Sequence, residues 1–483
     1  MPLRLKSATG RWVVAATVLG SSMVFLDGTV VNVALPTIGH EFDTGISELQ
    51  WVLNSYLLAL AALILLGGSM GDRFGRKRIF VIGAVWFTAA SVLCGLAPSV
   101  EWLIAGRVLQ GVGGALLAPG SLAILEAGFA REDRSRAIGI WSGLAGVSTA
   151  IGPPLGGWLI DAVSWRAVFF LNVPLGIAVV LVALRHIPES RDESLDGRLD
   201  FAGAGLAALA LGAISWALIE GPGRGFRTPE VLGAFVVGTI AAALFLLRER
   251  RAREPMLPLE LFRSRTFSAA NMLTFVVYGA FGGALFLLTV LLQTALGYSP
   301  LMAGLASLPV TIIMLLFSAR SGAVAQRIGP RLPLTVGPLV IAASLLAMHT
   351  IDIDSAYLTG VLPCVLLLAV GLVIVVAPVT ATTLAAAPDE RAGVASAVSN
   401  AVSRTGQLFA IALLPAIGGL QGNEYDDPTA IVSAFQTAVL FSAGLCVIGA
   451  VIAWLMIDND CLEGRELSAP APDPHLRGGS AGG

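Results

Sequence analysis

The chain has little charge for its length, and this scarcity excludes a soluble fold. Charged residues make up only 13% of the 483 positions, whereas hydrophobic residues make up 56%. The charged share is about half of that in an average soluble domain. A soluble chain with this balance would expose far too much apolar surface to water. We therefore expect a membrane protein, in which the distribution of charge along the chain matters more than the net charge of −2.

Residue types that bind metals or form disulfides are also rare. The four cysteines have neither the pairing nor the spacing of a disulfide framework or a zinc site. No nucleotide-binding loop occurs, and no soluble segment is longer than a short linker. These absences argue against a membrane-embedded enzyme or receptor and against ATP as the energy source. We expect no metal and no organic cofactor. The few candidates are His40, His186, His349, His475, Cys94, Cys364, Cys446 and Cys461.

The sequence instead contains fourteen long apolar segments. A helix needs about 20 mostly apolar residues to cross a bilayer. The first segment is too long for the core of a signal peptide and lacks a convincing cleavage site, so we expect it to be retained. The predicted fold class is an all-α membrane protein. The expected spans are 12–35, 51–69, 79–97, 101–125, 137–160, 167–183, 201–219, 231–247, 268–293, 302–324, 332–349, 357–380, 392–420 and 431–456.

The spans fall into groups of six, two and six. This grouping predicts an N-terminal six-helix bundle over residues 1–184, a linker region with two extra transmembrane helices over 185–265, and a C-terminal six-helix bundle over 266–456. The remaining tail, 457–483, contains Gly, Pro and Ser and is expected to be a disordered cytoplasmic segment. The two central spans carry no embedded charge. A lateral insertion and a role in substrate binding both remain open for them.

The arginines and lysines predict how the chain is oriented. Only Arg166, Arg224 and Arg227 fall in loops on the outer side, whereas most of the 30 basic residues fall in loops on the other. Because loops rich in Lys and Arg stay in the cytoplasm, both termini are expected there. Alanine- and arginine-rich composition with few lysines hints at a GC-rich bacterial source, which suggests the inner membrane. The predicted location is therefore the cell membrane, crossed many times.

One short stretch, residues 67–78 (GGSMGDRFGRKR), lies between two spans and is strongly basic. It holds five charges within seven residues, which cannot enter hydrocarbon. Gly75 allows a sharp reversal of the backbone, so we expect a tight turn here. A degraded copy follows at 322–331, with Gln326 in the place of Asp72. Such a repeat predicts two related halves with a substrate site between them.

This stretch resembles the signature between the second and third spans of the major facilitator superfamily. Further patterns resemble the drug:proton antiporters of that superfamily, beginning with LDGTVVNVALP at 26–36 in the first span. The sixth span begins with a pattern, 165–176, that is similar to the fourteen-span branch. The matching residues of the turn and of spans four and five are Gly68, Asp72, Arg73, Gly75, Arg76, Leu103, Arg107, Gln110, Gly111, Gly113, Gly139, Gly152, Pro153, Gly156 and Gly157. Met70, Gly71 and Ser148 depart from the patterns.

The resemblance implies a major facilitator fold, with two pseudo-symmetric six-helix bundles plus two extra central helices. It also implies a secondary active efflux transporter that exports drug-like or antibiotic-type compounds in exchange for protons by alternating access. The proton would be the coupling ion. A proton-independent facilitator and an exporter of an endogenous metabolite are the alternatives. The expected partners are a small organic molecule, protons and the lipid bilayer, with no nucleic acid, and the chain is expected to be a monomer.

Asp27 is the only acidic residue deep inside a predicted span. Counted from Pro36, it lies about 13 Å below the outer end of its helix, and Arg107 lies roughly 9 Å in from Glu101. Because the two have similar depth and each needs a partner, we expect them to meet. One interpretation is a fixed structural ion pair. The other, which the resemblance favours, is a proton carrier whose affinity is set by burial and by Arg107.

The charged turn suggests a gate on the cytoplasmic side. Glu126 lies roughly 28 Å along its helix from Arg107, which places it beside the turn. We expect an ion pair between Arg76 and Glu126. In the resembling family, Asp72 would sit at the N-terminus of the helix that begins near Arg391, where unsatisfied N–H groups stabilise a carboxylate.

The fifth span combines small residues and prolines that favour close helix contact and a kink. In resembling families this span seals the inner cavity and favours antiport; a plain packing seam fits the sequence equally well. A wide cavity with few fixed charges suits amphipathic or lipophilic substrates, cationic ones beside a lone carboxylate, although Arg404 could favour anions. The polar cavity candidates are Asn32, Asn54, Tyr56, Gln110, Asn271, Tyr278, Asn400, Arg404 and Gln407, and the apolar ones are Met23, Phe25, Phe275, Phe281 and Met314.

Overall fold

The computed structural model describes residues 3–192, 199–252, 255–388 and 391–465. Most of the expected tail lies outside this range. The helices are α1 (Ala8–Phe42), α2 (Ile46–Phe74), α3 (Arg76–Gly95), α4 (Val100–Gly128), α5 (Arg131–Ala162), α6 (Arg166–Phe170), α7 (Asn172–His186), α8 (Phe201–Arg224), α9 (Pro229–Arg251), α10 (Arg265–Thr294), α11 (Pro300–Ile328), α12 (Arg331–Met348), α13 (Leu362–Ala385), α14 (Ala392–Ile417) and α15 (Pro428–Met456). Short helical segments are η1 (Leu259–Arg263), η2 (Tyr357–Val361), η4 (Glu424–Asp426) and η5 (Asn459–Arg465).

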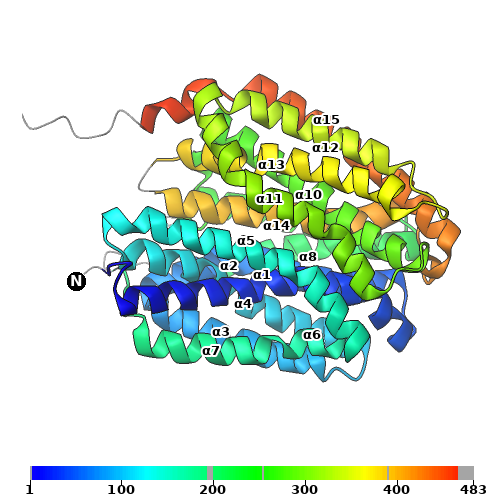
Figure 1. Cartoon of the computed structure of the whole chain (residues 1–483), viewed down its shortest axis with the longest axis horizontal. Helices are drawn as coiled ribbons and strands as arrows, with labels where there is room; N and C mark the ends of the chain where they lie inside the picture. Colours follow the sequence, from blue (N-terminus) through cyan, green and yellow to red (C-terminus); the bar gives the residue numbers. More distant parts are fainter. Residues whose placement is uncertain (1–2, 193–198, 253–254, 389–390, 466–483) are drawn as a thin grey trace, which may run out of the picture.

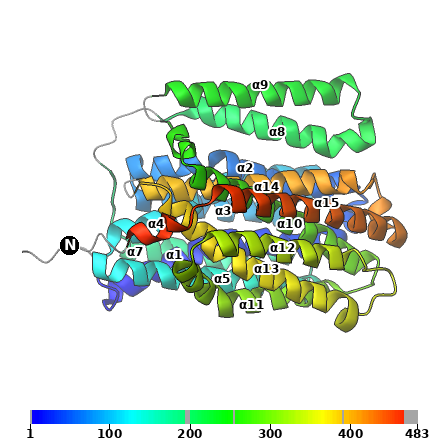
Figure 2. The same ribbon diagram turned by 90° about the horizontal axis from the view of Figure 1, so that it is seen from above.

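The long helices lie roughly side by side in two halves. Helices α1–α7 form one half and α10–α15 form the other, and α5 meets α11 along the seam between them (Figure 1). Helices α8 and α9 form a hairpin on one side of both halves, with α9 outermost (Figure 2). Because α6 and α7 follow each other across one crossing, the described helices make fourteen crossings. The predicted fold class is confirmed.

Twelve of these crossings are long and apolar enough to span a membrane by themselves. The two that are not, α5 and α14, were both expected from the sequence. Helix α5 begins with five charges in its first six residues, 131–136, and α14 carries Arg404 and several amide and hydroxyl groups. Both helices lie at contacts between the two halves, α5 against α11 and α14 against α2. A position between protein surfaces tolerates more polar residues than a lipid-facing one.

Two boundaries differ from those that the sequence predicts. Helix α1 continues through Pro36 to Phe42 and ends at Asp43, which adopts a left-handed conformation with φ 48°. Asp27 is therefore about 22 Å from the end of α1, not 13 Å, by the rise of an α-helix. The charged stretch 67–78 is also largely helical, because α2 extends to Phe74 and only Gly75 makes the turn, with φ 107°.

The copy of this stretch in the second half has the same geometry. Gly329 follows α11 with φ 81° and precedes α12 closely, as Gly75 follows α2 and precedes α3. A positive φ of this size favours glycine because a Cβ would clash with the backbone. Gly329 thus has the same conformational role as Gly75, although Gln326 stands in the place of Asp72.

The α8–α9 hairpin is fixed to α2 at both of its ends. At one end, Trp51 of α2 donates its indole N–H to Glu220 of α8 at 3.3 Å. At the other end, Leu66 of α2, Ala204 of α8 and Met256 of the following linker form a small apolar cluster. Helix α8 also contacts α14 of the second half. The hairpin therefore covers the seam where α2 and α14 meet.

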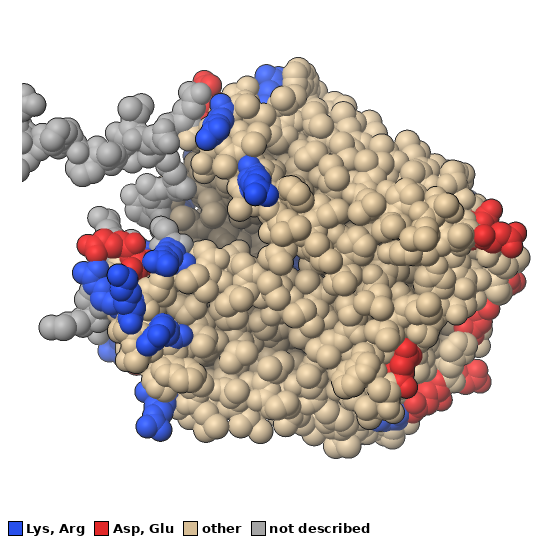
Figure 3. All heavy atoms as spheres, viewed as in Figure 1, with Lys and Arg blue, Asp and Glu red and all other residues tan. Residues whose placement is uncertain are grey.

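The two ends of the molecule carry opposite charge. Lys and Arg side chains gather at the end that holds the turn at Gly75, and Asp and Glu gather at the other end (Figure 3). We call these the basic end and the acidic end. The acidic end contains the arginines Arg166, Arg224 and Arg227 and the acidic residues Glu41, Asp43, Glu48, Glu101, Asp161, Glu220, Glu230, Asp352, Asp354, Glu424, Asp426 and Asp427.

Candidate functional site

Asp27 and Arg107 meet in the middle of the first half. Asp27 is 2% exposed and Arg107 is fully buried. Nη1 of Arg107 donates a hydrogen bond to Oδ2 of Asp27, and the two groups form an ion pair. The spatial pairing expected from their depths is therefore present, between α1 and α4. Their role in proton coupling stays a prediction.

Two amide side chains complete the shell of the carboxylate. Nε2 of Gln110 donates to Oδ1 of Asp27 at 2.7 Å, and Nδ2 of Asn172 donates to the same oxygen at 3.2 Å. Ser91 accepts from both amides, at 3.2 and 3.0 Å, and donates to the carbonyl oxygen of Phe169 at 2.9 Å. The ionised carboxylate is thus held by three donors from α4 and α7. We call Asp27, Arg107, Gln110, Asn172 and Ser91 the carboxylate cluster.

Arg107 has further partners that fix its guanidinium. Its Nε donates to the carbonyl oxygen of Val52 at 3.0 Å, and Nη1 donates to Oε1 of Gln110 at 2.7 Å. The guanidinium carbon lies 4.3 Å from the ring centroid of Tyr56, a cation–π distance. Its Nη2 is buried without a hydrogen-bond partner in the described part of the chain. Arg107 therefore depends on Asp27 for its charge balance.

Asn172 and Ser91 are cluster residues that the sequence reasoning did not single out as a site. Asn172 stands in the pattern at 165–176, and a fully buried amide inside an apolar helix needs a partner. That signal could have marked Asn172. Ser91 gave no comparable signal, because a small hydroxyl in a transmembrane helix commonly bonds to the backbone of its own helix.

The nine polar cavity candidates separate into groups. Gln110 and Tyr56 belong to the buried surroundings of Asp27, and Asn54 and Asn271 are buried within their own halves. Asn32 reaches from α1 to the carbonyl oxygen of Leu285 in α10 at 3.4 Å, so it joins the halves. Asn400 is exposed. Tyr278, Arg404 and Gln407 lie on α10 and α14, the helices of the second half that face the first.

The apolar cavity candidates also have different surroundings. Tyr278, Phe281 and Met314 line a small pocket of about 50 Å³ with Val277, Leu372 and Val376. Phe275 packs edge-on against Phe409 of α14 at 6.3 Å. Met23 is fully buried inside the first half. Phe25 faces Arg404, whose guanidinium carbon lies 5.9 Å from the centroid of its ring.

At the acidic end the two halves are in direct backbone contact. The amide of Ile46 donates to the carbonyl oxygen of Gly422 at 2.8 Å, and the hydroxyl of Tyr425 donates to the carbonyl oxygen of Thr44 at 2.9 Å. Deeper in the same seam, Gln50 of α2 donates to the carbonyl oxygen of Ile411 in α14 at 2.6 Å. These contacts close the acidic end.

The glycines expected in the fifth span differ in how closely other helices pack on them along α5. A Cβ added at Gly157 would lie 2.4 Å from the carbonyl oxygen of Pro300, and one at Gly304 of α11 would lie 2.3 Å from that of Pro153. Gly152 and Gly156 pack just as closely on α1. A Cβ at Gly139, near the basic end, would meet nothing within 4 Å, and the same holds for Gly143 and Gly146. An added methyl group would therefore meet a neighbouring helix at the glycines of α5 near the acidic end, but not at the three glycines nearer the basic end.

The basic end is open between the halves. Figure 3 shows a hollow there, between the charged surface of the first half and the body of the second. The charged residues bordering it pair mainly within their own half. Arg76 pairs with Asp72 at 2.7 Å, and Arg391 of the second half pairs with Glu260 at 2.8 Å. The expected Arg76–Glu126 ion pair is absent from the described residues, because Asp72, just across the Gly75 turn, holds Arg76.

The expected position of Asp72 at the N-terminus of α14 also differs from the structure. Glu126 approaches that helix end, since a Cβ added at Gly393 would be 3.9 Å from its Oε2, whereas Asp72 pairs with Arg76 at 2.7 Å. Glu126 remains within electrostatic range of Arg76 and Arg134. Gly68, also expected in the gate, packs toward Pro119 of α4. Arg73 lies beside the turn in α2. Of the expected gate residues, Glu126 thus approaches the second half, whereas Asp72 and Arg76 pair within the first.

The linker after α7 caps the turn. Oε1 of Glu189 accepts from the amide of Lys77 at 3.1 Å, and Oε2 accepts from that of Arg78 at 3.2 Å. In the second half, Oδ1 of Asn459 accepts from the amide of Arg331 at 3.2 Å, two residues after the equivalent glycine. Each acceptor satisfies free N–H groups at a helix N-terminus. The repeat therefore extends to a capping residue that the sequence reasoning missed.

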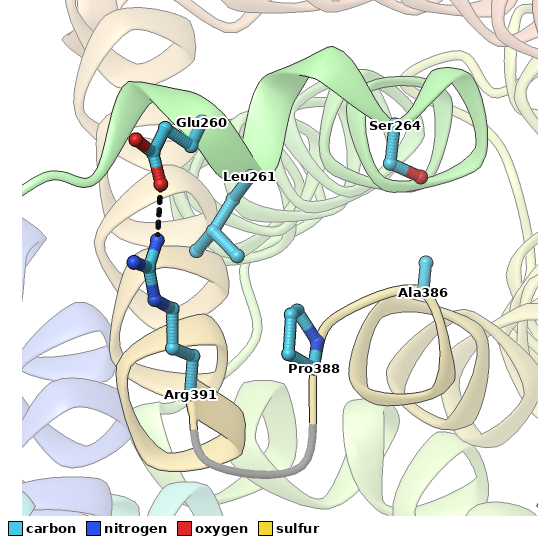
Figure 4. Close-up of a pocket in the computed structure, with 6 residues that line it drawn as sticks. All are labelled: Glu260, Leu261, Ser264, Ala386, Pro388 and Arg391. Atoms are coloured by element: carbon cyan, nitrogen blue, oxygen red, sulfur yellow. Dashed lines mark hydrogen bonds and ion pairs between the residues drawn. The ribbon is translucent and has the colours of Figure 1, made fainter.

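A separate pocket of about 510 Å³ lies at the basic end of the second half (Figure 4). It is lined by Glu260, Leu261, Ser264, Ala386, Pro388 and Arg391. The Arg391–Glu260 ion pair bridges one side of it and uses its two charged groups on each other. Within the described ranges, no three His, Cys, Asp or Glu side chains are grouped so that they could hold a metal ion.

Comparison with known proteins gives consistent results. The profile of the Major Facilitator Superfamily matches residues 17–411. The tetracenomycin C resistance and export protein of Streptomyces glaucescens is 39% identical over 83% of this chain and 74% of its own length. The methylenomycin A resistance protein of Bacillus subtilis is 35% identical over 93% of this chain and 95% of its own. The multidrug resistance protein Stp of Mycobacterium tuberculosis is 37% identical over 83% and 74%.

Solved structures are similar in fold. A bacterial homologue of the human lysosomal transporter Spinster gives a TM-score of 0.66 with 18% identity, covering 96% of this chain and 100% of that one. A D-xylose–proton symporter gives a TM-score of 0.66 with 16% identity, covering 93% and 98%. At these identities the likeness concerns the fold alone.

Proposed function

Because the chain belongs to the major facilitator superfamily, we propose that it exports drug-like or antibiotic-type organic compounds in exchange for protons. It is a multi-pass membrane transporter and not an enzyme. Relatives that share more than a third of its sequence are named as resistance or export proteins for tetracenomycin C and methylenomycin A. Those names support organic compounds of this kind as the cargo.

The charge distribution supports an orientation with the basic end in the cytoplasm. Lys and Arg concentrate at that end, and loops rich in these residues are retained on the cytoplasmic side. Both termini would then be cytoplasmic. In this orientation the structure is open to the cytoplasm and closed to the outside, a state that accepts cargo from the cell.

The observation that carries the proposal of proton coupling is the carboxylate cluster. It holds the acidic residue found deep in a span, buried beside one cation and two amide donors. When a proton binds to Asp27, the ion pair is lost and Arg107 is left as a buried charge without its counter-ion. An uncompensated buried charge costs about 3–5 kcal/mol, enough to favour a different arrangement of α1 against α4. Release of the proton restores the pair.

This arrangement can couple proton movement to alternating access. Helix α1 carries Asp27 and also contacts the second half through Asn32, five residues further along the chain toward the acidic end. A shift of α1 on α4 would therefore reach the seam between the halves. Rocking of one half against the other about a central site is the movement that such repeats permit.

The test uses purified protein in liposomes with an imposed pH gradient and two dyes, fluorescein and rhodamine 123. The wild type should move at least one dye uphill and move protons when that dye is added. Asp27→Asn keeps the shape and removes the charge, so uphill transport should fall to background while downhill exchange persists. Asp352→Asn, at an exposed acidic residue outside the spans, is the matched control and should behave as the wild type.

Two other results would point elsewhere. Gradient-driven transport at the wild-type level in a well-expressed Asp27→Asn protein would remove Asp27 as the carrier. Equal loss of folded protein in Asp27→Asn and Arg107→Gln would favour a structural ion pair. A proton-independent facilitator, the second candidate, would move dye downhill without any proton movement.

A further inference from the structure

We infer that Arg404 is the residue that selects the cargo by charge, and that it binds the oxygen anion of an acidic aromatic compound, such as a carboxylate or a phenolate. The inference rests on the proposed export function. It depends on the position of Arg404, on its lack of a counter-ion, and on the inaccessibility of the nearest carboxylate.

Arg404 lies in the middle of α14 and points toward the first half. Its guanidinium carbon is 5.9 Å from the ring centroid of Phe25 in α1. The side chain therefore reaches the space between the halves at the depth of Asp27, two residues beyond Phe25.

The backbone that carries Arg404 is held firmly. A Cβ added at Gly406 would lie 2.4 Å from the carbonyl oxygen of Phe275 in α10, so α14 and α10 are in backbone contact there. On the next turn, Gln407 covers Gly282 of α10. A recognition residue on such a rigid element keeps its direction when the cargo binds.

Arg404 has no counter-ion among the residues that the structure describes. Its Nε is buried without a hydrogen-bond partner, while the side chain as a whole is half-buried. A cation deep inside a membrane protein is costly unless a partner satisfies it. Arg107, the other cation at this depth, has its carboxylate; Arg404 has a planar set of free donors suited to an oxygen anion.

Asp27 cannot supply the opposite charge to the cargo. It is 2% exposed, and both of its oxygens are engaged by Arg107, Gln110 and Asn172. The space between the halves therefore presents one unpaired positive charge and no accessible negative charge at this level of the described structure. This arrangement argues against the expectation of a lone carboxylate that attracts cationic cargo.

Aromatic side chains around Arg404 favour a flat, conjugated cargo. Phe25 approaches from the first half. Phe409 stands on α14 with Arg404, and Phe275 and Tyr278 stand on α10, which packs against α14. Rings of this kind stack on other rings, and an arginine beside them can hold the acidic group of the same molecule. The combination selects aromatic anions over aromatic cations.

The test compares two dyes with the same xanthene skeleton and opposite charge. Fluorescein is an anion at pH 8 and rhodamine 123 is a cation. Their binding is measured by fluorescence anisotropy on protein in nanodiscs without a proton gradient. The wild type should bind fluorescein more tightly. Arg404→Gln should weaken fluorescein binding at least about tenfold and change rhodamine 123 binding less than about twofold, since a charged hydrogen bond is lost for one dye only. Arg404→Lys should restore part of the affinity.

Arg320→Gln is the matched control. Arg320 is an arginine of the same half that also stacks on a phenylalanine, Phe317 at 5.6 Å, but it lies on the exposed part of α11. It should bind both dyes as the wild type does. Equal weakening of both dyes by Arg404→Gln, no change in either, or wild-type preference for rhodamine 123 would each overturn the inference. Because binding is measured without a gradient, failure of proton coupling would leave this result intact.

Discussion

The contacts near the acidic end of α5 differ in kind from those near its basic end. At the acidic end, α5 and α11 are in backbone contact at Gly157 and Gly304. A carbonyl oxygen of the opposite helix lies where the Cβ of a larger residue would be. At the basic end the same helix, α5, has glycines with empty space around them. The charged residues there are paired mainly inside their own halves, as in the Asp72–Arg76 pair.

This difference explains how one fold can have two gates. Backbone contacts close a seam tightly but allow no larger residue, so small residues are required at every contact point. Exposed ion pairs contribute about 1 kcal/mol or less each and can exchange partners easily. An end that uses them can open and close at low cost.

The largest expected effect comes from placing a methyl group in the closed seam. In Gly157→Ala the Cβ would lie 2.4 Å from the carbonyl oxygen of Pro300 and 2.5 Å from Cα of Leu301, so backbone atoms must move. We expect at least about a tenfold fall in the ratio of closed to open acidic ends, which corresponds to about 1.4 kcal/mol. Maleimide labelling of a cysteine placed at Thr44, in a background without the natural cysteines, reports this ratio.

Gly143→Ala is the matched control for that experiment. It is a glycine of the same helix whose added Cβ would meet nothing within 4 Å. Labelling at Thr44 should be unchanged in this variant, because alanine also favours the helix. If both variants open the acidic end equally, the effect belongs to α5 as a whole and the contrast between its two ends is wrong.

A smaller effect is expected at the basic end, where Arg76 can choose between two carboxylates. With this end open, Arg76 pairs with Asp72 at 2.7 Å, and Glu126 lies farther away. In thermal unfolding, Asp72→Asn and Arg76→Gln should therefore be non-additive by about 0.5 kcal/mol, whereas Arg76→Gln and Glu126→Gln should be additive. Stronger coupling of Arg76 to Glu126 would mean that the protein in solution rests with its basic end closed.

The smallest expected effect concerns the pH dependence of the closed acidic end. Burial raises the pKa of the Asp426 carboxyl above its ordinary 3.8, as does Asp43, while His40 lowers it. His40 and Asp426 also face each other across the two halves at 3.7 Å. A raised pKa means that the Asp426 carboxyl binds its proton more tightly when the acidic end is closed. Protonation of Asp426 therefore favours the closed form fully below pH 3.8, and this stabilisation is lost as the pH rises through the raised pKa of Asp426.

The Asp426→Asn variant tests this sign. Its acidic end should stay closed to the same degree across the pH range in which the wild type becomes less closed. The change in the wild type should be less than about 0.5 kcal/mol. Distances between spin labels on the two halves at this end measure the change. Closure of the wild type that strengthens as the pH rises from 4 to 6 would contradict the assignment to Asp426.

The sequence by itself determined the fold class, the number of crossings and the pairing of Asp27 with Arg107. These follow from strong local physics. A run of about 20 apolar residues must cross a bilayer, and a charge inside such a run must find a partner at its own depth. The glycine of the turn was determined in the same way, since its position between two spans required a reversal that Gly75 supplies with φ 107°.

Only the tertiary structure decided which other side chains contact Asp27 and which carboxylate pairs with Arg76. Asn172 lies 145 residues from Asp27 in sequence, and its place in the carboxylate cluster depends on how α7 packs on α1 and α3. Helix length predicts a pair between Arg76 and Glu126, but the structure pairs Arg76 with Asp72, which lies just across the Gly75 turn. The asymmetry between sealed Asp27 and unpaired Arg404 arises for the same reason. Whether a side chain is buried depends on how the helices pack, and the sequence next to Asp27 or Arg404 does not determine it.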